Sequence, residues 1–275
     1  MRLWVLGSGS RGNAVVLDDG TGEARVLVDA GFGVRTLAAR LAAARIPPES
    51  IVACVVTHEH VDHVRGAVQA TARWGWGLHA SEGTVRAHPP LGAAGAIAFR
   101  AGDTVRVGGL ALQTVRTPHD AVESVAIVAT ATATGARAGV CYDLGHATDA
   151  VRQAMRDLDL LVLEANHDEG MLRAGPYPPS VCSRIAGSHG HLSNGAAAGL
   201  ARDVASGTLR HVVLAHLSES CNDAPVATAA VSAALRATRF RGAVAAAGQD
   251  VVAGPFVAAS GRRAAPAAQQ LTLAL

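Results

Sequence analysis

The sequence contains no lysine and very few aromatic residues. All 24 basic residues of the 275-residue chain are arginine, and aromatic residues make up only 3%. Because apolar residues still reach 49%, we expect Ala, Val and Leu to fill the core. The lack of lysine and the Ala-rich stretches indicate mutational bias in the source genome and not a functional arginine pattern. The net charge of +2 neither favours nor excludes a nucleic-acid partner.

Two further absences concern disulfides and membrane segments. The four cysteines, Cys54, Cys141, Cys182 and Cys221, form no C-x-x-C pair, so we expect reduced thiols. No run of about 18 apolar residues is present, and we expect no transmembrane helix. The first residues lack the charged lead and apolar run of a signal peptide. We therefore expect a cytoplasmic protein with no membrane partner.

Strands and helices alternate in the first third of the chain, and strands dominate the middle. Apolar runs and turn residues predict strands at 1–6, 14–17, 25–29, 51–56, 111–116, 122–130, 137–141, 158–163 and 211–214. Helices are predicted at 34–45, at about 62–74, at about 194–205 and at about 225–236. This order predicts an α/β chain with helices packed outside a two-sheet core, followed by a loosely ordered tail at 258–275.

The stretch "LGSGSRGNA", residues 6–14, has the G-x-G-x-x-G spacing of a dinucleotide-binding loop. Such a loop requires a strand before the glycines and a helix directly after them. Here the following residues, 14–17, predict a second strand, so a hairpin would offer no helix N-terminus to a phosphate. We therefore expect these glycines to shape a tight loop and not to bind a nucleotide.

Four side chains of metal-ligand type lie within six residues directly after the apolar strand 51–56. They are His58, His60, Asp62 and His63, in the pattern H-x-H-x-D-H. Strand-like spacing places the first two side chains on one side of the chain, and the turn into the next helix presents the other two nearby. Imidazole and carboxylate ligands suit Zn²⁺ and tolerate Mn²⁺. The alternative, a polar loop with surface histidines, does not account for this alternation.

The pattern after a strand resembles the signature of the metallo-β-lactamase fold, a four-layer αββα sandwich with metals at one edge of the sheets. The blocks "LGSGSRGNA", "THEHVDH", "TPHDAVESV", "EANHDEGMLRAGPYP", "GHLSN" and "LAHLSESCN" together resemble the YycJ/WalJ group of bacterial metallohydrolases, over about residues 3–222. The resemblance implies a single hydrolase domain over residues 1–257 and two bound divalent ions, Zn or Mn.

The resemblance also implies a set of metal ligands at strand ends. The first ion would take His58, His60 and His119, the second Asp62, His63 and His216, and Asp143 would bridge the two. Asp29, at the end of its strand, would orient a ligand instead of binding metal.

The metal ions by themselves do not protonate a leaving alkoxide. The blocks "LVLEANHD" and "GHLSNGAAAGLA" resemble segments of tRNA 3′-processing endonucleases, in which a Glu and a His together deliver a proton. This resemblance implies that His191 is the general acid and that Glu164 fixes its tautomer, with Asp62 completing the catalytic set. The alternatives are a helix cap for His191 and a cap or surface carboxylate for Glu164.

The activity implied by the resemblance is that of a phosphodiesterase acting on nucleic acid, a 5′-to-3′ exonuclease on DNA that uses a metal-bound hydroxide. The chain lacks the large inserted domain of β-CASP nucleases and a protruding arm for tRNA, which disfavours ribonuclease functions. The main alternative is a small-molecule hydrolase for a thioester, a lactone or a cyclic phosphodiester, and a binding module without turnover comes third. Substrate contacts are expected from Ser8, Ser10, Asn13, His167 and Asn194.

Overall fold

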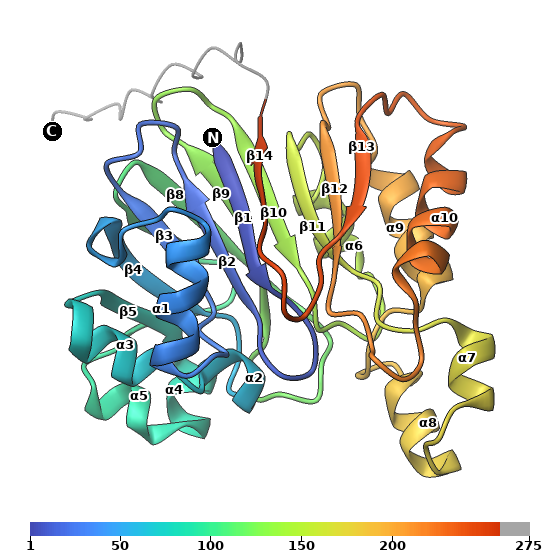
Figure 1. Ribbon diagram of the computed structural model, residues 1–275, viewed down its shortest axis with the longest axis horizontal. Helices are drawn as coiled ribbons and strands as arrows, with labels where there is room; N and C mark the ends of the chain where they lie inside the picture. The colour runs from blue at the N-terminus through green and yellow to red at the C-terminus, as the bar shows by residue number, and fades with distance from the viewer. Residues whose placement is uncertain (259–275) are drawn as a thin grey trace, which may run out of the picture.

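Two seven-stranded sheets are stacked face to face, with helices on both outer faces (Figure 1). The structure is a computed structural model that describes residues 1–258. The first sheet has the strand order β14-β1-β2-β3-β4-β5-β6, and the second has the order β13-β12-β11-β10-β9-β8-β7. The four-layer αββα sandwich expected from the sequence is thus confirmed.

The first sheet is built from the N-terminal part of the chain and the last strand. Its strands are β1 (Arg2–Gly7), β2 (Ala14–Asp18), β3 (Arg25–Val28), β4 (Ile51–Val56), β5 (Gly77–Ser81), β6 (Ile97–Phe99) and β14 (Ala253–Val257). The helices on this side are α1 (Val34–Ala43), α2 (Val61–Val64), α3 (Ala67–Trp74), α4 (Glu82–Ala87) and α5 (Pro89–Ala93), with a 3₁₀ turn at Pro48–Ser50.

The second sheet is built from the rest of the chain. Its strands are β7 (Thr104–Val107), β8 (Leu110–Arg116), β9 (Val125–Ala131), β10 (Arg137–Cys141), β11 (Leu160–Glu164), β12 (His211–Ala215) and β13 (Ala243–Ala246). The helices on its outer face are α6 (Asp149–Ala154), α9 (Asn194–Val204) and α10 (Ala224–Leu235). Two further helices, α7 (Glu169–Ala174) and α8 (Pro179–Ile185), lie beyond the lower edge of the sheets (Figure 1).

The apolar core has three layers because each sheet buries both of its faces. Side chains such as Leu3, Val15 and Ile127 fill the space between the sheets. A second cluster, which includes Leu200, packs the second sheet on α6, α9 and α10. A third, which includes Leu37, packs the first sheet on α1 and α3. The continuous apolar runs of β4, β11 and β12 are what strands covered on both faces require.

Parallel pairing brings the functional loops to one edge. β3 pairs with β4, β10 with β11, and β11 with β12, all in parallel register. The carboxyl ends of these five strands therefore point to the same edge, at the bottom of Figure 1. In α/β sheets, the loops after such strand ends are the usual place for ligands.

Several expected elements differ in detail from the observed ones. The helix expected at about 62–74 is two helices, α2 and α3, separated at Gly66. A side chain at Gly66 would overlap the carbonyl oxygen of Phe32, and the Gly66 amide donates to the Ala30 carbonyl at 2.8 Å. The break thus follows from a tertiary contact. The strands β5, β6, β7, β13 and β14 were not expected, and each is only three to five residues long.

The glycine loop of residues 6–14 is the predicted hairpin. β1 and β2 pair in antiparallel register on either side of it, and no helix follows the glycines. At Gly12, whose φ is +154°, a side chain would collide with the ring of Phe32. Backbone shape and close packing therefore account for these glycines.

Residues 1–258 can be compared with the expectations on membrane segments and thiols. Across residues 1–258, no helix has the length and apolar character needed to cross a membrane. The four cysteines are free, as expected, and only Cys182 is not buried. Apart from Ala258, the tail expected at 258–275 lies outside the described residues.

Gly31 offers a test of how tightly the loops are packed at this edge. A Cβ atom at Gly31 would overlap the carbonyl oxygen of Asp62 and lie 2.6 Å from the amide nitrogen of Asn13. We expect Gly31→Ala to lower the free energy of unfolding by about 1–3 kcal/mol, measured by urea titration. The control is Gly199→Ala in α9, where no atom lies within 4 Å of the added group. This variant should gain about 0.5–1 kcal/mol, and equal stabilities of the two variants would contradict the packing argument.

Candidate metal centre

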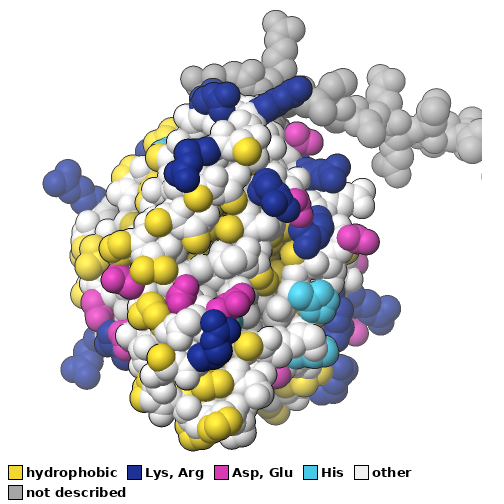
Figure 2. Space-filling view, turned by 90° about the vertical axis from the view of Figure 1, so that its right-hand side faces the viewer, with side chains coloured by type: hydrophobic (Ala, Val, Ile, Leu, Met, Phe, Trp, Pro, Cys, Tyr) yellow, Lys and Arg dark blue, Asp and Glu magenta, His cyan; other side chains and the backbone are white. Residues whose placement is uncertain are grey.

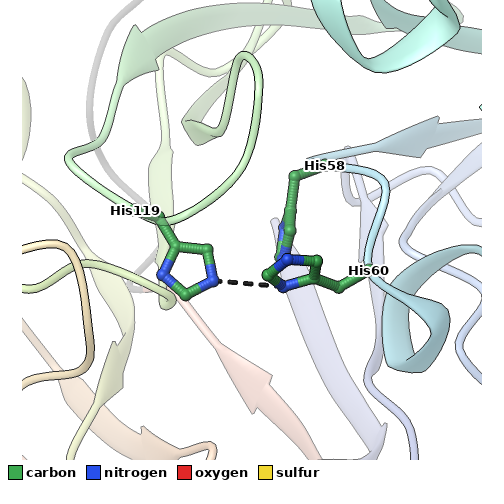
Figure 3. Close-up of side chains that lie close together, drawn as sticks. All are labelled: His58, His60 and His119. Carbon is green, nitrogen blue, oxygen red and sulfur yellow. Dashed lines mark hydrogen bonds between the residues drawn. The ribbon is translucent and has the colours of Figure 1, made fainter. Parts of the chain in front are cut away.

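Three histidines from the first and second sheets form the first group of potential ligands. His58 and His60 follow β4, and His119 follows β8; one nitrogen of each lies within 4.8 Å of the others. Figure 3 shows the three imidazoles, with His119 Nε2 at 3.2 Å from His60 Nδ1. Such a cluster of imidazole nitrogens suits a divalent transition metal.

A second group lies directly beside the first. It consists of Asp62 and His63, from α2, and His216, which follows β12. The Asp62 Oδ2 atom lies 3.3 Å from His216 Nε2 and 3.4 Å from His63 Nε2. The helical turn after the β4 strand presents its two side chains on the side of the second sheet.

Asp143 lies between the two groups. Its carboxylate follows β10 and is only 2% exposed. One oxygen is 3.0 Å from His63 Nε2, and the other is 3.9 Å from His119 Nε2. The carboxylate therefore reaches one member of each group, which is the position of a ligand shared by two ions.

The chemistry of the donor atoms fits divalent cations. His58 is completely buried, and its Nε2 atom has no hydrogen-bond partner among the described residues. Burial holds the pKa of His58 well below its ordinary value, so the imidazole is neutral and can donate a lone pair. A buried polar atom without a partner is costly, and a metal ion supplies that partner. The His and Asp clusters are consistent with a binuclear metal site.

Two other histidines of the ligand groups, His63 and His216, hold protons whose positive charge balances the nearby carboxylates in the absence of cations. Burial disfavours a charged His63, but the Asp143 and Asp29 carboxylates hold its pKa well above the ordinary value. Burial likewise opposes a charge on His216, while Asp143 and Asp62 raise its pKa to about 9. Metal binding displaces protons from such ligands, so the cations would take over the role of these protons.

Asp29 supports the site from behind and is not itself in a ligand group. It is fully buried, and its carboxylate accepts hydrogen bonds from the Thr57 amide at 2.7 Å and the Tyr142 hydroxyl at 2.6 Å. It also lies 2.8 Å from Nδ1 of His63. A carboxylate on the far nitrogen of a ligating imidazole fixes its tautomer and orientation.

Three of these residues have a left-handed backbone. Asp29, Asp143 and His216 have φ values of 61°, 56° and 55°. Asp29 and His216 are the first residues after β3 and β12, and Asp143 is the second residue after β10. The reversed local turn directs each side chain toward the common edge. Non-glycine residues adopt this conformation rarely, and it recurs at functional sites where the surrounding structure enforces it.

Glu164 and His191 form a carboxylate–imidazole pair beside the second group. Glu164 Oε1 lies 2.7 Å from His191 Nδ1 and 3.2 Å from His216 Nδ1. Burial opposes a charge on His191, but Glu164 and Asp143 raise its pKa to about 11. Burial also opposes ionisation of Glu164, yet His191 lowers its pKa to about 2. The pair is therefore an ion pair in the metal-free protein.

The alternative roles of this pair do not agree with the structure. Ser193, not His191, caps helix α9, because its hydroxyl accepts from the amide of Ala196. Glu164 is 0% exposed at the end of β11 and is neither a cap nor a surface carboxylate.

The five expected substrate contacts have different locations. Ser8 and Asn13 are buried, and the Ser8 hydroxyl donates to Asn13 Oδ1 at 2.7 Å. Asn194 is also buried, with its amide nitrogen bonded to Asn222. These three side chains are thus engaged within the protein, and their contact with substrate stays a prediction. Ser10 is exposed at the mouth of the site, and His167 lines a neighbouring cavity.

The structure adds supporting residues that sequence reasoning did not identify. Tyr142 joins Asp29 to the second sheet, and the Asn166 amide donates to the His216 carbonyl at 2.9 Å. Ser8, already named as an expected substrate contact, also supports the site, because its hydroxyl accepts from the His216 amide at 2.8 Å. Tyr142 and Asn166 are adjacent to residues already chosen, in "CYDLGH" and "EANHD", and that adjacency was the available signal.

Comparison with known proteins identifies the family. Residues 24–217 match the family described as "Beta-lactamase superfamily domain". The chain belongs to the β-lactamase superfamily. Within this superfamily it is 31% identical over 242 residues to the exodeoxyribonuclease YycJ of Bacillus anthracis, covering 86% of this chain and 89% of the relative. It is 30% identical over 234 residues to the exodeoxyribonuclease WalJ of Streptococcus pneumoniae, covering 79% and 82%.

Solved structures share the fold at low sequence identity. The metallo-β-lactamase fold protein YhfI of Bacillus subtilis superposes with a TM-score of 0.66 at 18% identity, covering 91% of this chain and 97% of that one. Zn²⁺-bound PqqB of Methylobacterium extorquens gives a TM-score of 0.64 at 17% identity, covering 92% and 100%. Human tRNase Z, short form, gives 0.61 at 17% identity, covering 94% and 100%. The fold is therefore the metallo-β-lactamase fold, and the expected relationship to YycJ and WalJ is confirmed.

Asp143 provides the test of a shared ligand. We expect the purified protein to bind about two divalent ions per chain and Asp143→Ala to lose at least one, since its carboxylate would be shared by both ions. Elemental analysis of dialysed protein measures the stoichiometry. Asp103→Ala, which removes an exposed carboxylate outside the ligand groups, should keep the wild-type metal content. Unchanged stoichiometry in Asp143→Ala would exclude this residue from the metal centre.

Proposed function

We propose that the protein is a dinuclear metal-dependent phosphodiesterase that shortens DNA from its 5′ ends. The observation that carries this proposal is the position of the Glu164–His191 pair, which lies beside two adjoining ligand groups. Two ions and a proton donor are the components that hydrolysis of a phosphodiester with a poor leaving group requires. The similarity to two exodeoxyribonucleases over most of the chain supports DNA as the substrate.

The ligand roles follow from the two groups and the residue between them. We assign His58, His60 and His119 to one ion, Asp62, His63 and His216 to the other, and Asp143 to both. Bound Zn²⁺ or Mn²⁺ would supply an activated water nucleophile and neutralise charge on the phosphate. Asp29 keeps the imidazole of His63 in the orientation that coordination needs.

His191 is the proposed donor of the proton that the leaving oxygen needs. Its Nδ1 atom is held by Glu164 at 2.7 Å, so Nε2 is the atom available to the substrate. As the oxygen of water forms its bond to phosphorus, the bond to the leaving oxygen breaks and His191 donates a proton to that oxygen. Glu164 stabilises the charged imidazole and prevents it from rotating away.

The mouth of the site suits a phosphate chain. The cavity above the ligands has a volume of about 200 Å³, and Ser10, Tyr177 and Arg184 line its rim. The Arg184 guanidinium is 75% exposed, and its Nε lies 3.2 Å from Asp120. Contacts between such an arginine and DNA phosphates would release counterions. We therefore expect the rate of DNA hydrolysis to fall steeply with salt concentration, whereas the rate on a small uncharged ester should not depend on salt in this way.

The reaction is tested with linear DNA. In Mn²⁺, we expect the protein to shorten strands labelled at the 3′ end from their 5′ ends and to release small products, resolved by denaturing electrophoresis. The matched substrate is a closed circle of the same sequence, which should stay intact. Nicked circles together with intact linear ends would contradict an exonuclease, and turnover of thioesters or lactones alone would support a small-molecule hydrolase.

The acid role of His191 is tested with two leaving groups. We expect His191→Ala to retain its metals and fold but to lose roughly 10²–10⁴-fold in kcat on DNA, because the leaving alkoxide needs a proton. A nitrophenyl phosphodiester, whose phenolate leaves without protonation, should lose far less. Glu164→Gln should give a milder version of the same pattern. Equal losses on both substrates, with metal content and melting temperature unchanged, would reject the acid role.

A further inference from the structure

A second cavity adjoins the metal centre on the other side of His191. It has a volume of about 410 Å³ and lies among α7, α8 and the start of α9. His191 lines this cavity and also the smaller one above the metal ligands. Its imidazole therefore stands in a wall common to both. Figure 2 shows this side of the molecule, where charged, histidine and apolar side chains alternate over the surface.

The lining offers an apolar surface together with a few polar groups. Leu172 and Ala196 contribute the apolar part. His167 is only 2% exposed, and its Nδ1 atom has no hydrogen-bond partner among the described residues. Arg173 is exposed and forms no ion pair in the described part of the chain. Small-molecule sites combine these features, with volumes of about 300–1,000 Å³.

The charged groups of the cavity are arranged asymmetrically. Glu169 accepts a hydrogen bond from the Ser193 hydroxyl at 3.2 Å, so this acidic side chain is tied to the start of α9. Arg173, one helical turn later on α7, is not paired with it. Glu169 is thus engaged by Ser193, whereas Arg173 offers a guanidinium without an ion pair in the described part of the chain, a group that prefers a phosphate.

We propose that this cavity, the terminal-nucleotide pocket, binds the nucleotide that is released from the 5′ end of the strand. The base would rest against Leu172 and Ala196, with His167 at its polar edge, and the 5′-phosphate would face Arg173. This inference rests on the proposed function, which it deepens by assigning the leaving group.

The location of His191 determines which bond breaks. The group that receives its proton must extend to the His191 side of the phosphorus, where the terminal-nucleotide pocket lies. A cavity of about 410 Å³ holds a small molecule and not a long strand, so the leaving group is one nucleotide. Shortening from the 5′ end then requires that the P–O3′ bond breaks. Water contributes its oxygen to phosphorus, and O3′ of the departing nucleotide takes the proton.

With this assignment, every round of cleavage starts from a strand with the same kind of 5′ end. The released product is a nucleoside 5′-monophosphate with a free 3′-hydroxyl, and the shortened strand retains the phosphate as its new 5′ end. Each product strand therefore carries the group that Arg173 recognises in the next cycle. A strand that begins with a 5′-hydroxyl lacks this contact and should be cut more slowly in its first cycle.

Equilibrium binding of dAMP to the metal-loaded protein tests the pocket without turnover. We expect Arg173→Ala and Ala196→Leu to weaken dAMP binding by roughly 10- to 100-fold in calorimetry, as expected for loss of a charged hydrogen bond or of space. Arg86→Ala is the matched control, since Arg86 is also an exposed arginine in the last turn of a short helix, α4. Deoxyadenosine should bind more weakly than dAMP and be insensitive to Arg173→Ala.

Cys182 provides an independent readout of occupancy. It lines the pocket and is the one cysteine of the described chain that is not buried. We expect dAMP to slow its alkylation by iodoacetamide at least several-fold in the wild type and to have little effect in Ala196→Leu. Peptide mass spectrometry identifies the alkylated residue and excludes reaction elsewhere.

The outcomes separate this inference from the proposed function. If both variants bind dAMP like the wild type, or inorganic phosphate competes equally in all of them, the nucleotide is held by the metals alone and the pocket assignment is overturned. If the protein shortens DNA but releases nucleoside 3′-monophosphates, the assigned bond is wrong. If dAMP binding behaves as expected and DNA is not cleaved, the pocket stands and the exonuclease proposal fails.

Discussion

The carboxylate of Asp29 accepts hydrogen bonds from both sheets at once. Thr57 contacts it from the first sheet and Tyr142 from the second, and His63 lies at 2.8 Å on a third side. Because this carboxylate is completely buried, losing one of these partners would leave it less well compensated away from water. The relative position of the two sheets is thus fixed at the edge where each contributes ligands. The geometry of the metal centre depends on this contact.

Several buried ionisable groups lie around that contact, and their negative charges must be balanced by positive ones because they are shielded from water. Asp143 and Glu164 are both buried, and the imidazolium charges of His63, His191 and His216 balance them in the absence of cations. Divalent ions would take the place of the protons on the ligands, while the pair of Glu164 and His191 would remain free to move one. Metal binding and folding would therefore be linked. In the proposed mechanism His191 donates the proton, although its Nδ1 atom lies only 3.3 Å from the Asp143 carboxylate.

The local part of this site was predictable from sequence, and the long-range part was not. His58 to His63 follow an apolar strand with ligand spacing, whereas the joining of His119, Asp143 and His216 required a resemblance, because each stands alone in its segment. The interruption at Gly66 and the engagement of Ser8 depend on side-by-side packing of distant loops. The walls of the terminal-nucleotide pocket come from α7 and α8, which carry too few periodic apolar residues to be recognised as helices.

The left-handed backbone at Asp29, Asp143 and His216 also restricts how such a site could evolve. Asp, Asn, His and glycine tolerate that conformation best, while β-branched residues are strained in it. A descendant that exchanged ligands at the latter two positions would therefore draw from a short list of oxygen and nitrogen donors. Aspartate and histidine, which are present at these two positions, are among the side chains that this conformation favours. The turn after the strand, and not only the side chain, thus limits the inorganic chemistry open to this lineage.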